Sequence, residues 1–259
     1  MHAQTDYATY LRIDELLDLQ QPLTVGAHDE MLFIVVHQVY ELWFKLILHE
    51  LDAAAAALDR ARPEMALAPM QRAVAVEELL IDQLRVLESM SPDGFIGFRD
   101  PLAPASGFQS TQFREIEAVS GSGDARHLRD AGRSDVHIAT LAERLSRRSL
   151  YDALGTAMRG LGHAFPEGED PAQREARLGT LAGLYRHHDD PLRTILHQVC
   201  EALVSHDETV ARWRHHHALM AAREIGSRTG TGGSLGTAYL QTTLDRRFFP
   251  ELWEVRNRL

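Results

Sequence analysis

The amino-acid sequence predicts an all-α protein. Residues that favour helices dominate its 259 positions, and alternating β-branched segments, which are typical of strands, are few. The clearest helical period lies in residues 29–51, where large apolar side chains recur every three or four positions. The length allows one large domain or two small ones, and it is enough to bury a substantial core.

Composition excludes several classes of function. The net charge of −10 is opposite in sign to that expected of a nucleic-acid-binding protein. Cys200 is the single cysteine, which rules out an internal disulfide and fits a reducing cytoplasm. The N-terminal residues lack a basic stretch followed by an apolar core, so we expect no secretory signal. No window approaches 18 uncharged apolar residues, and we therefore expect a cytoplasmic protein without a membrane span.

The chain begins with an amphipathic segment. Residues 5–20 predict a short helix that ends before Gln21-Pro22, and its apolar positions are Tyr7, Tyr10, Leu11, Leu16 and Leu17. A helix at a terminus has little to bury against within its own chain. We therefore expect residues 1–22 to reach a neighbouring subunit.

Residues 29–51 form the helix around which we expect the rest of the chain to pack. Large side chains at helical spacing share one face, namely Phe33, His37, Tyr40, Phe44, Ile47 and Leu51. Val35, Leu42 and Leu46 widen the apolar surface, which indicates a central helix contacted on several sides. His37 has two interpretations. It is a core histidine bonded to a backbone carbonyl, or it forms with Phe33 one wall of a pocket for a flat apolar ligand.

A second helix is predicted over residues 68–90, with Val74, Leu79, Leu80, Leu84 and Leu87 on its inner side. Residues 91–94 predict a turn, and residues 94–117 an irregular loop that folds inward to bury Phe95, Phe98 and Phe108. Arg99 would lie at the edge of this apolar site. It either binds a carboxylate with both nitrogens or belongs to a structural ion pair.

The helical periodicity is weaker in residues 120–190, where short helices are predicted around 136–145, 150–161 and 175–185. No chemistry can be assigned to this region. A long helix follows over residues 191–225. Its last third contains three consecutive histidines, which point about 100° apart and cannot converge on one metal ion. His217 shares the apolar stripe with Trp213, so we expect it to point inward, where a single histidine can ligate a haem iron.

Residues 227–237 hold four glycines among hydroxyl side chains. They are not a Walker loop, because no Gly-Lys-Ser/Thr follows. The segment is either a flexible connector or a loop whose backbone N–H groups bind an anion. The last 21 residues predict two short helices broken at Pro250.

These segments together resemble the tryptophan 2,3-dioxygenase family. The matching strings are YATYLRIDELLDLQQPL, HDEMLFIVVHQVYELWFKLILHEL, FRDPLAPASGFQSTQFREIE, WRHHH, GTGGSLG and LDRRFFPELWEVRNRL, and they occur in the family's order. The resemblance covers well over half the chain, and the middle third does not contribute to it. It implies one mainly helical domain over residues 1–259, with 120–190 as a variable region, b-type haem as cofactor and a homotetramer.

The resemblance also implies roles for individual residues. His217 would be the iron ligand and His37 the histidine that meets the indole N–H. Phe33 and Phe95 would line the substrate pocket, Arg99 would bind the substrate carboxylate, and Thr231 would hold the amino-acid backbone. Ser106 and Gly107 match the segment near the iron-bound oxygen, and together with Trp213 they would line the haem. Tyr7, Tyr10 and Leu11 match residues that enter the neighbouring subunit's site.

The implied reaction adds both atoms of O₂ across the indole C2–C3 bond of L-tryptophan and gives N-formylkynurenine. Two alternatives stay open. One is a related haem monooxygenase that forms an oxindole from tryptophan or a methylated tryptophan, and the other is a non-catalytic sensor of haem or tryptophan. We also expect the chain to be short for the family, with the missing length in the middle region.

Overall fold

The computed structural model describes residues 6–130, 133–187, 190–226, 228 and 236–259. Every regular element in these ranges is helical, which confirms the all-α prediction. The helices are α1 (Tyr7–Leu11), α2 (Ile13–Leu17), α3 (His28–Asp59), α4 (Pro63–Leu87), α5 (Pro92–Leu102), η1 (Gly107–Gln109), α6 (Thr111–Val119), η2 (Ala125–Arg129), α7 (Asp135–Ser146), α8 (Leu150–Gly160), α9 (Pro171–Arg186), α10 (Pro191–Ile225), α11 (Thr237–Gln241), α12 (Pro250–Glu254) and η3 (Val255–Arg258).

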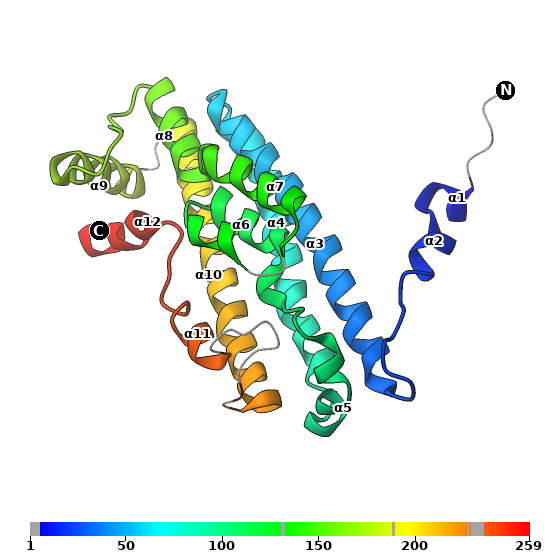
Figure 1. The fold of residues 1–259 in the computed structure, drawn as a ribbon. Coiled ribbons are helices and arrows are strands. Elements are labelled where there is room, and N and C mark those ends of the chain that lie inside the picture. Colours follow the sequence, from blue (N-terminus) through cyan, green and yellow to red (C-terminus); the bar gives the residue numbers. More distant parts are fainter. Residues whose placement is uncertain (1–5, 131–132, 188–189, 227, 229–235) are drawn as a thin grey trace.

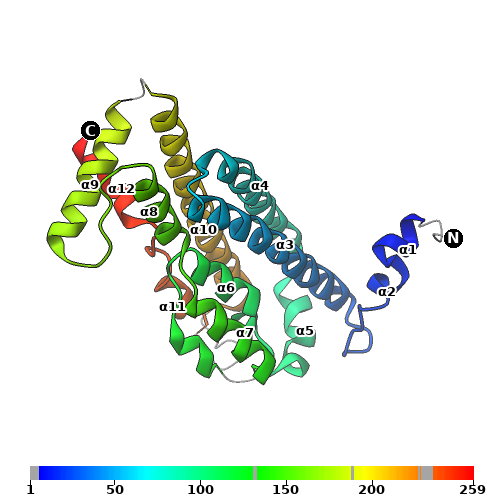
Figure 2. The same cartoon turned by 90° about the horizontal axis from the view of Figure 1, so that it is seen from above.

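Three long helices, α3, α4 and α10, form the centre of the molecule (Figure 1). Helix α4 packs against both of the others. Helices α6, α7 and α8 gather on one side of the three, and α6 and α8 pack on α3 (Figure 2). The predicted central helix is thus confirmed: its apolar face is buried from Tyr40 through Leu58, and it contacts α4, α5, α6 and α8.

Helix α10 has the predicted bounds because both of its ends are specified locally. Asp190 accepts a hydrogen bond from the Leu192 N–H, and Pro191 occupies the first helical position, where its missing N–H costs nothing. At the other end Gly226 adopts a φ of 59°, a conformation that side chains disfavour and that stops the helix.

Several details of the helix predictions are wrong. The helix predicted over residues 5–20 is two short helices within residues 7–17, because Arg12 adopts a left-handed conformation between them. Helix α4 starts earlier than expected, at Pro63, and Leu79 faces solvent. Val35 and Leu42 of α3 are also exposed, since the cavity and the neighbouring helices take up only part of its circumference.

Two buried polar clusters fasten the shorter elements to α10. The Asp207 carboxylate accepts hydrogen bonds from the Phe248 and Phe249 N–H groups and from the Trp253 indole, which holds the C-terminal segment. The His206 imidazole forms hydrogen bonds with the Glu77 carboxylate of α4 at 2.6 Å and with the Ser120 hydroxyl at 2.8 Å. Both residues of α10 are fully buried, so these bonds replace lost hydration and fix α4, α6 and α10 in one register.

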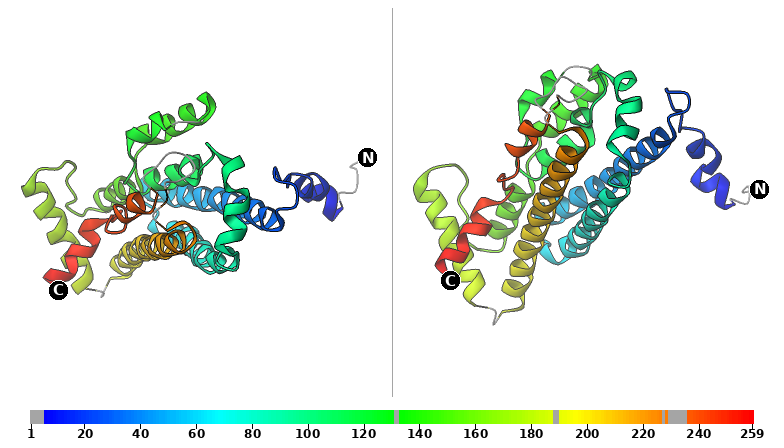
Figure 3. Two further views of the ribbon diagram at one scale, coloured as in Figure 1. Left: turned by 60° about the horizontal axis from the view of Figure 1, so that its bottom comes forward. Right: turned by 90° about the horizontal axis from the view of Figure 1, so that it is seen from below.

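The two ends of the chain lie at opposite sides of the molecule (Figure 3). Helices α1 and α2 stand apart from the bundle, and no residue of either helix is buried. Among the described residues, α3 is the one helix long and apolar enough to cross a membrane. A core helix of a soluble protein passes the same test, and α3 packs within the bundle and contains Glu30, Glu41, Lys45 and Glu50.

Candidate active site

A cavity of about 500 Å³ lies between the bundle helices α3 and α10, helix α5 and the segment before α6. This volume is within the range of ligand pockets. Along α3 the lining runs from Phe33 to Phe44, eleven positions that span about 16 Å. Along α10 it runs from Trp213 to Ile225. The cavity is therefore long enough for a large flat molecule, and its walls are mainly apolar.

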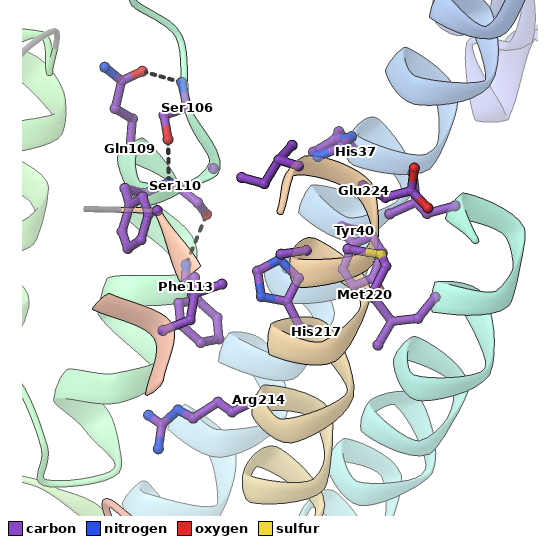
Figure 4. A pocket seen from close by; sticks show the side chains of 18 of the residues that line it. His37, Tyr40, Ser106, Gln109, Ser110, Phe113, Arg214, His217, Met220 and Glu224 are labelled. Atoms are coloured by element: carbon purple, nitrogen blue, oxygen red, sulfur yellow. Dashed lines mark hydrogen bonds between the residues drawn. The ribbon is translucent and has the colours of Figure 1, made fainter. Parts of the chain in front are cut away.

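His217 projects from α10 into this cavity (Figure 4). Burial, together with smaller effects of the nearby His37 and His216, lowers the pKa of its imidazole to about 4. The ring is therefore neutral at pH 7, the state in which it binds a metal. The Trp213 ring stacks on it with centroids 5.0 Å apart and planes 5° apart. Trp213 itself donates to the Tyr40 hydroxyl at 3.4 Å, and Tyr40 donates to the Leu80 carbonyl at 2.6 Å, so the orientation of His217 is supported by α3 and α4.

His37 lines the same cavity from α3 and also bonds a backbone carbonyl. Its Nδ1–H donates to the Phe33 carbonyl at 2.7 Å. Burial lowers the pKa of His37, so the neutral ring prevails and its Nε2 keeps a lone pair that can accept a hydrogen bond. The Phe33 ring lies 4.0 Å from the imidazole, centroid to centroid, and forms the adjoining apolar wall.

The predicted turn over residues 91–94 and most of the predicted loop over residues 94–117 are wrong, because residues 92–102 form helix α5 and residues 111–119 form helix α6. Ser91 accepts from the Gly94 N–H and caps the helix, with Pro92 at its first position. The helix brings Phe95 and Arg99 to the cavity one turn apart. Phe98 is fully buried and packs with Phe95 and Phe33, with ring centroids 5.4 and 5.5 Å away respectively.

The segment from Ser106 to Ser110 forms the wall opposite α10 (Figure 4). Ser106 and Gln109 cap each other across the short helix η1, which fixes Gly107 between them. The buried Arg133 guanidinium donates to the carbonyls of Phe108 and Gln109 and to the Thr111 hydroxyl. Nothing in the sequence pattern indicated Arg133, which holds this wall from a segment more than twenty positions away.

At one end of the cavity two arginines share one carboxylate. Glu117 of α6 accepts from Arg114 at 2.5 Å and from Arg214 of α10 at 2.9 Å, and all three side chains are buried. The Arg114 Nε has no hydrogen-bond partner in the part of the chain that the structure describes. The three groups carry a net charge of +1, which in a buried place calls for an anion. The residue set therefore fits a flat apolar ligand that bears acidic groups and a metal.

Three predicted site residues do not lie in the cavity wall. Tyr7, Tyr10 and Leu11 are on α1, exposed and away from this chain's own cavity. Thr231 lies outside the described residues. Eight others meet at the cavity: Phe33, His37, Phe95, Arg99, Ser106, Gly107, Trp213 and His217.

Comparison with known proteins decides the family. The model of the family described as "Tryptophan 2,3-dioxygenase" matches residues 1–150 and 156–259. The chain belongs to the tryptophan 2,3-dioxygenase family. It is 42% identical to a tryptophan 2,3-dioxygenase of Nocardioides sp., over 99% of this chain and 96% of that protein. The proteins of that name from Anaeromyxobacter sp. (99% of this chain, 97% of that protein) and Herpetosiphon aurantiacus (96% of each) are each 41% identical.

Membership in the tryptophan 2,3-dioxygenase family corrects two expectations about the middle of the chain. The family match runs through residues 120–190 apart from 151–155, so the middle third does contribute. The chain also spans nearly the full length of the three relatives above and is not short beside them. It covers 88% of a tryptophan 2,3-dioxygenase of Xanthomonas campestris, which is a longer protein than this chain.

Proposed function

We propose that this chain is a haem-dependent dioxygenase that cleaves the indole C2–C3 bond of L-tryptophan with O₂ and yields N-formylkynurenine. The observation that carries the proposal is one cavity that contains a neutral, inward-pointing His217 from α10, a neutral His37 from α3, and Arg99 from α5. Relatives named tryptophan 2,3-dioxygenase at about 40% identity support the same reaction.

The residues present fit haem b. His217 has a free lone pair for iron, and Trp213 and Phe113 give flat apolar contact surface beside it. The buried Arg114, Glu117 and Arg214 leave one positive charge for a propionate. When bound, haem supplies the redox chemistry that activates O₂.

Arg99 and His37 would select and orient the substrate. Each charge of a zwitterion in an apolar cavity requires a partner of opposite charge, and the Arg99 guanidinium can pair with the carboxylate. The neutral His37 accepts a hydrogen bond at Nε2, which matches the indole N–H, a donor only. Phe33 and Phe95, with centroids 5.7 Å apart, would pack against the ring and exclude water.

The remaining roles rest on the family resemblance. Thr231 would hold the amino-acid backbone, and Ser106 and Gly107 would border the site where O₂ reacts. Tyr7, Tyr10 and Leu11 are large apolar side chains left exposed on α1, as expected of a segment that enters another subunit. We propose a cytoplasmic homotetramer in which this segment completes the neighbour's site.

The deciding experiment loads purified protein with hemin, reduces it without oxygen, and then adds L-tryptophan and air. The dioxygenase gives a product heavier by two oxygen atoms with the absorbance of N-formylkynurenine. A gain of one oxygen atom would replace the proposal with oxindole formation, and tryptophan binding without turnover would replace it with a sensor. The variant His217→Ala serves as control and should lose the haem absorbance band.

A further inference from the structure

Arg133 lies behind the cavity wall of residues 106–110 and connects it to further polar side chains. Its two terminal nitrogens donate four hydrogen bonds. Three of them reach the wall and the residue after it, namely the Gln109 carbonyl at 3.1 Å, the Phe108 carbonyl at 3.4 Å and the Thr111 hydroxyl at 2.7 Å. The fourth reaches Oδ2 of Asp130 at 3.3 Å. Among the described residues, the Arg133 side chain thus bonds either to this wall region or to Asp130.

Asp130 supplies the negative charge that Arg133 requires. The Arg133 side chain is fully buried, and Asp130 is the one acid of the described residues that lies within ion-pair distance of it. The three acceptors on the wall side are uncharged. Because a buried guanidinium without a counter-ion is costly, Asp130 is what allows an arginine to stay at this place.

A third residue fixes the carboxylate of Asp130. The Nδ1–H of His127 donates to the same Oδ2 at 2.9 Å. The His127 ring is buried, and its Nε2 has no hydrogen-bond partner in the described part of the chain, so the ring bonds Asp130 alone there. The Asp130 side chain is 32% exposed and could otherwise adopt several rotamers. A continuous series of hydrogen bonds therefore runs from His127 through Asp130 and Arg133 to the cavity wall.

We infer that Asp130 is a positioning residue for the substrate cavity and that it acts through Arg133. The inference rests on the proposed function, in which the wall segment with Ser106 and Gly107 borders the site where O₂ reacts. Ser106 and Gln109 cap each other within this segment, which fixes its shape (Figure 4). Its place relative to the rest of the molecule depends on bonds from outside the segment, and Arg133 donates two of these to backbone carbonyls. A small displacement of such a wall can weaken substrate binding and turnover severely.

The test is a double-mutant cycle on haem-loaded protein with Asp130→Ala, Arg133→Ala and the double variant. Calorimetry measures the dissociation constant of L-tryptophan, and steady-state kinetics measure kcat/KM. Asp130→Ala should raise the dissociation constant on the order of fivefold and lower kcat/KM at least as much. The double variant should lose no more than Arg133→Ala alone, because Asp130 then has nothing left to position. The matched control is Asp135→Ala at an exposed aspartate in the first turn of α7, which should change neither quantity.

The inference is overturned if Asp130→Ala lowers the thermal midpoint but binds and converts L-tryptophan like the wild type. It is also overturned if the losses of the two single variants add up in the double variant. Hemin titration should show full haem uptake in each variant, and Asp130→Asn, which keeps the shape and removes the charge, carries the same comparison if the alanine variant does not take up haem. Failure of the proposed function is a separate result, in which the wild-type protein itself neither binds nor converts L-tryptophan.

Discussion

Glu117 is the residue whose replacement should most disturb the apoprotein. Its carboxylate is 3% exposed and neutralises Arg114 at 2.5 Å and Arg214 at 2.9 Å, neither of which forms an ion pair with another acid among the described residues. The change Glu117→Gln keeps the shape but leaves two buried guanidinium groups side by side. Removal of one partner from a buried pair costs about 3–5 kcal/mol. For a protein of this size that corresponds to a fall of roughly 6–20 °C in the thermal midpoint.

Thermal unfolding followed by circular dichroism measures this fall in apoprotein and in haem-loaded protein. Haem should reduce the difference between variant and wild type, because a propionate would restore an anion beside the two arginines. The control is Glu143→Gln, whose carboxylate pairs with Arg147 on the surface and should leave the midpoint almost unchanged. A midpoint for Glu117→Gln apoprotein within the range of this control would refute the charge argument.

Three further changes test the substrate and wall residues. Arg99→Ala should raise the KM for L-tryptophan roughly 30-fold or more and leave the affinity for tryptamine, which lacks the carboxylate, unchanged; a shared loss would remove the assigned role. Burial lowers the pKa of His37 below its ordinary 6.5, and only the neutral ring accepts the indole N–H, so L-tryptophan affinity should hold from pH 8 to about 6.5 and fall in acid. 1-Methyl-L-tryptophan has no indole N–H, so an equal fall of its affinity in acid would contradict a hydrogen bond from the indole to His37. Arg133→Ala removes the donors that hold the wall at Phe108 and Gln109, and it should lower the thermal midpoint and weaken L-tryptophan binding while hemin titration shows full haem uptake.

The long helices could be predicted because their burial follows a local period. In α3 and α10 the side chains that share a face are three or four positions apart, and the caps of α10 lie in the adjacent residues. Helix α5 was missed for a related reason. Ser-Pro-Asp-Gly is a common turn sequence, yet serine followed by proline also starts a helix, and the continuation through Phe98 decides between the two.

Arg99 was predicted, but the buried charged groups Arg214, Glu117 and Arg133 could not be, because their partners are far apart in the chain. Arg214 and Glu117 are 97 positions apart, and Arg133 reaches back to Phe108 across 25. One weak signal was present: Arg214 adjoins Trp213 and lies three positions before His217, so it belongs near the same surface of α10. Glu224 likewise interrupts an apolar stripe that includes Met220, a place where an acid requires a reason.

The acids of the cavity differ in what their charge does for the molecule. Glu117 pairs with two arginines and links α6 to α10, so its replacement should lower the stability of the protein even before any ligand binds. Glu224 has no hydrogen-bond partner among the described residues, so Glu224→Gln, which removes a buried charge, should raise the stability of the apoprotein. The two glutamine variants should therefore move stability in opposite directions while both preserve side-chain shape. That opposition separates a carboxylate that pairs two helices from one that is buried without a partner, and it can be measured without any turnover.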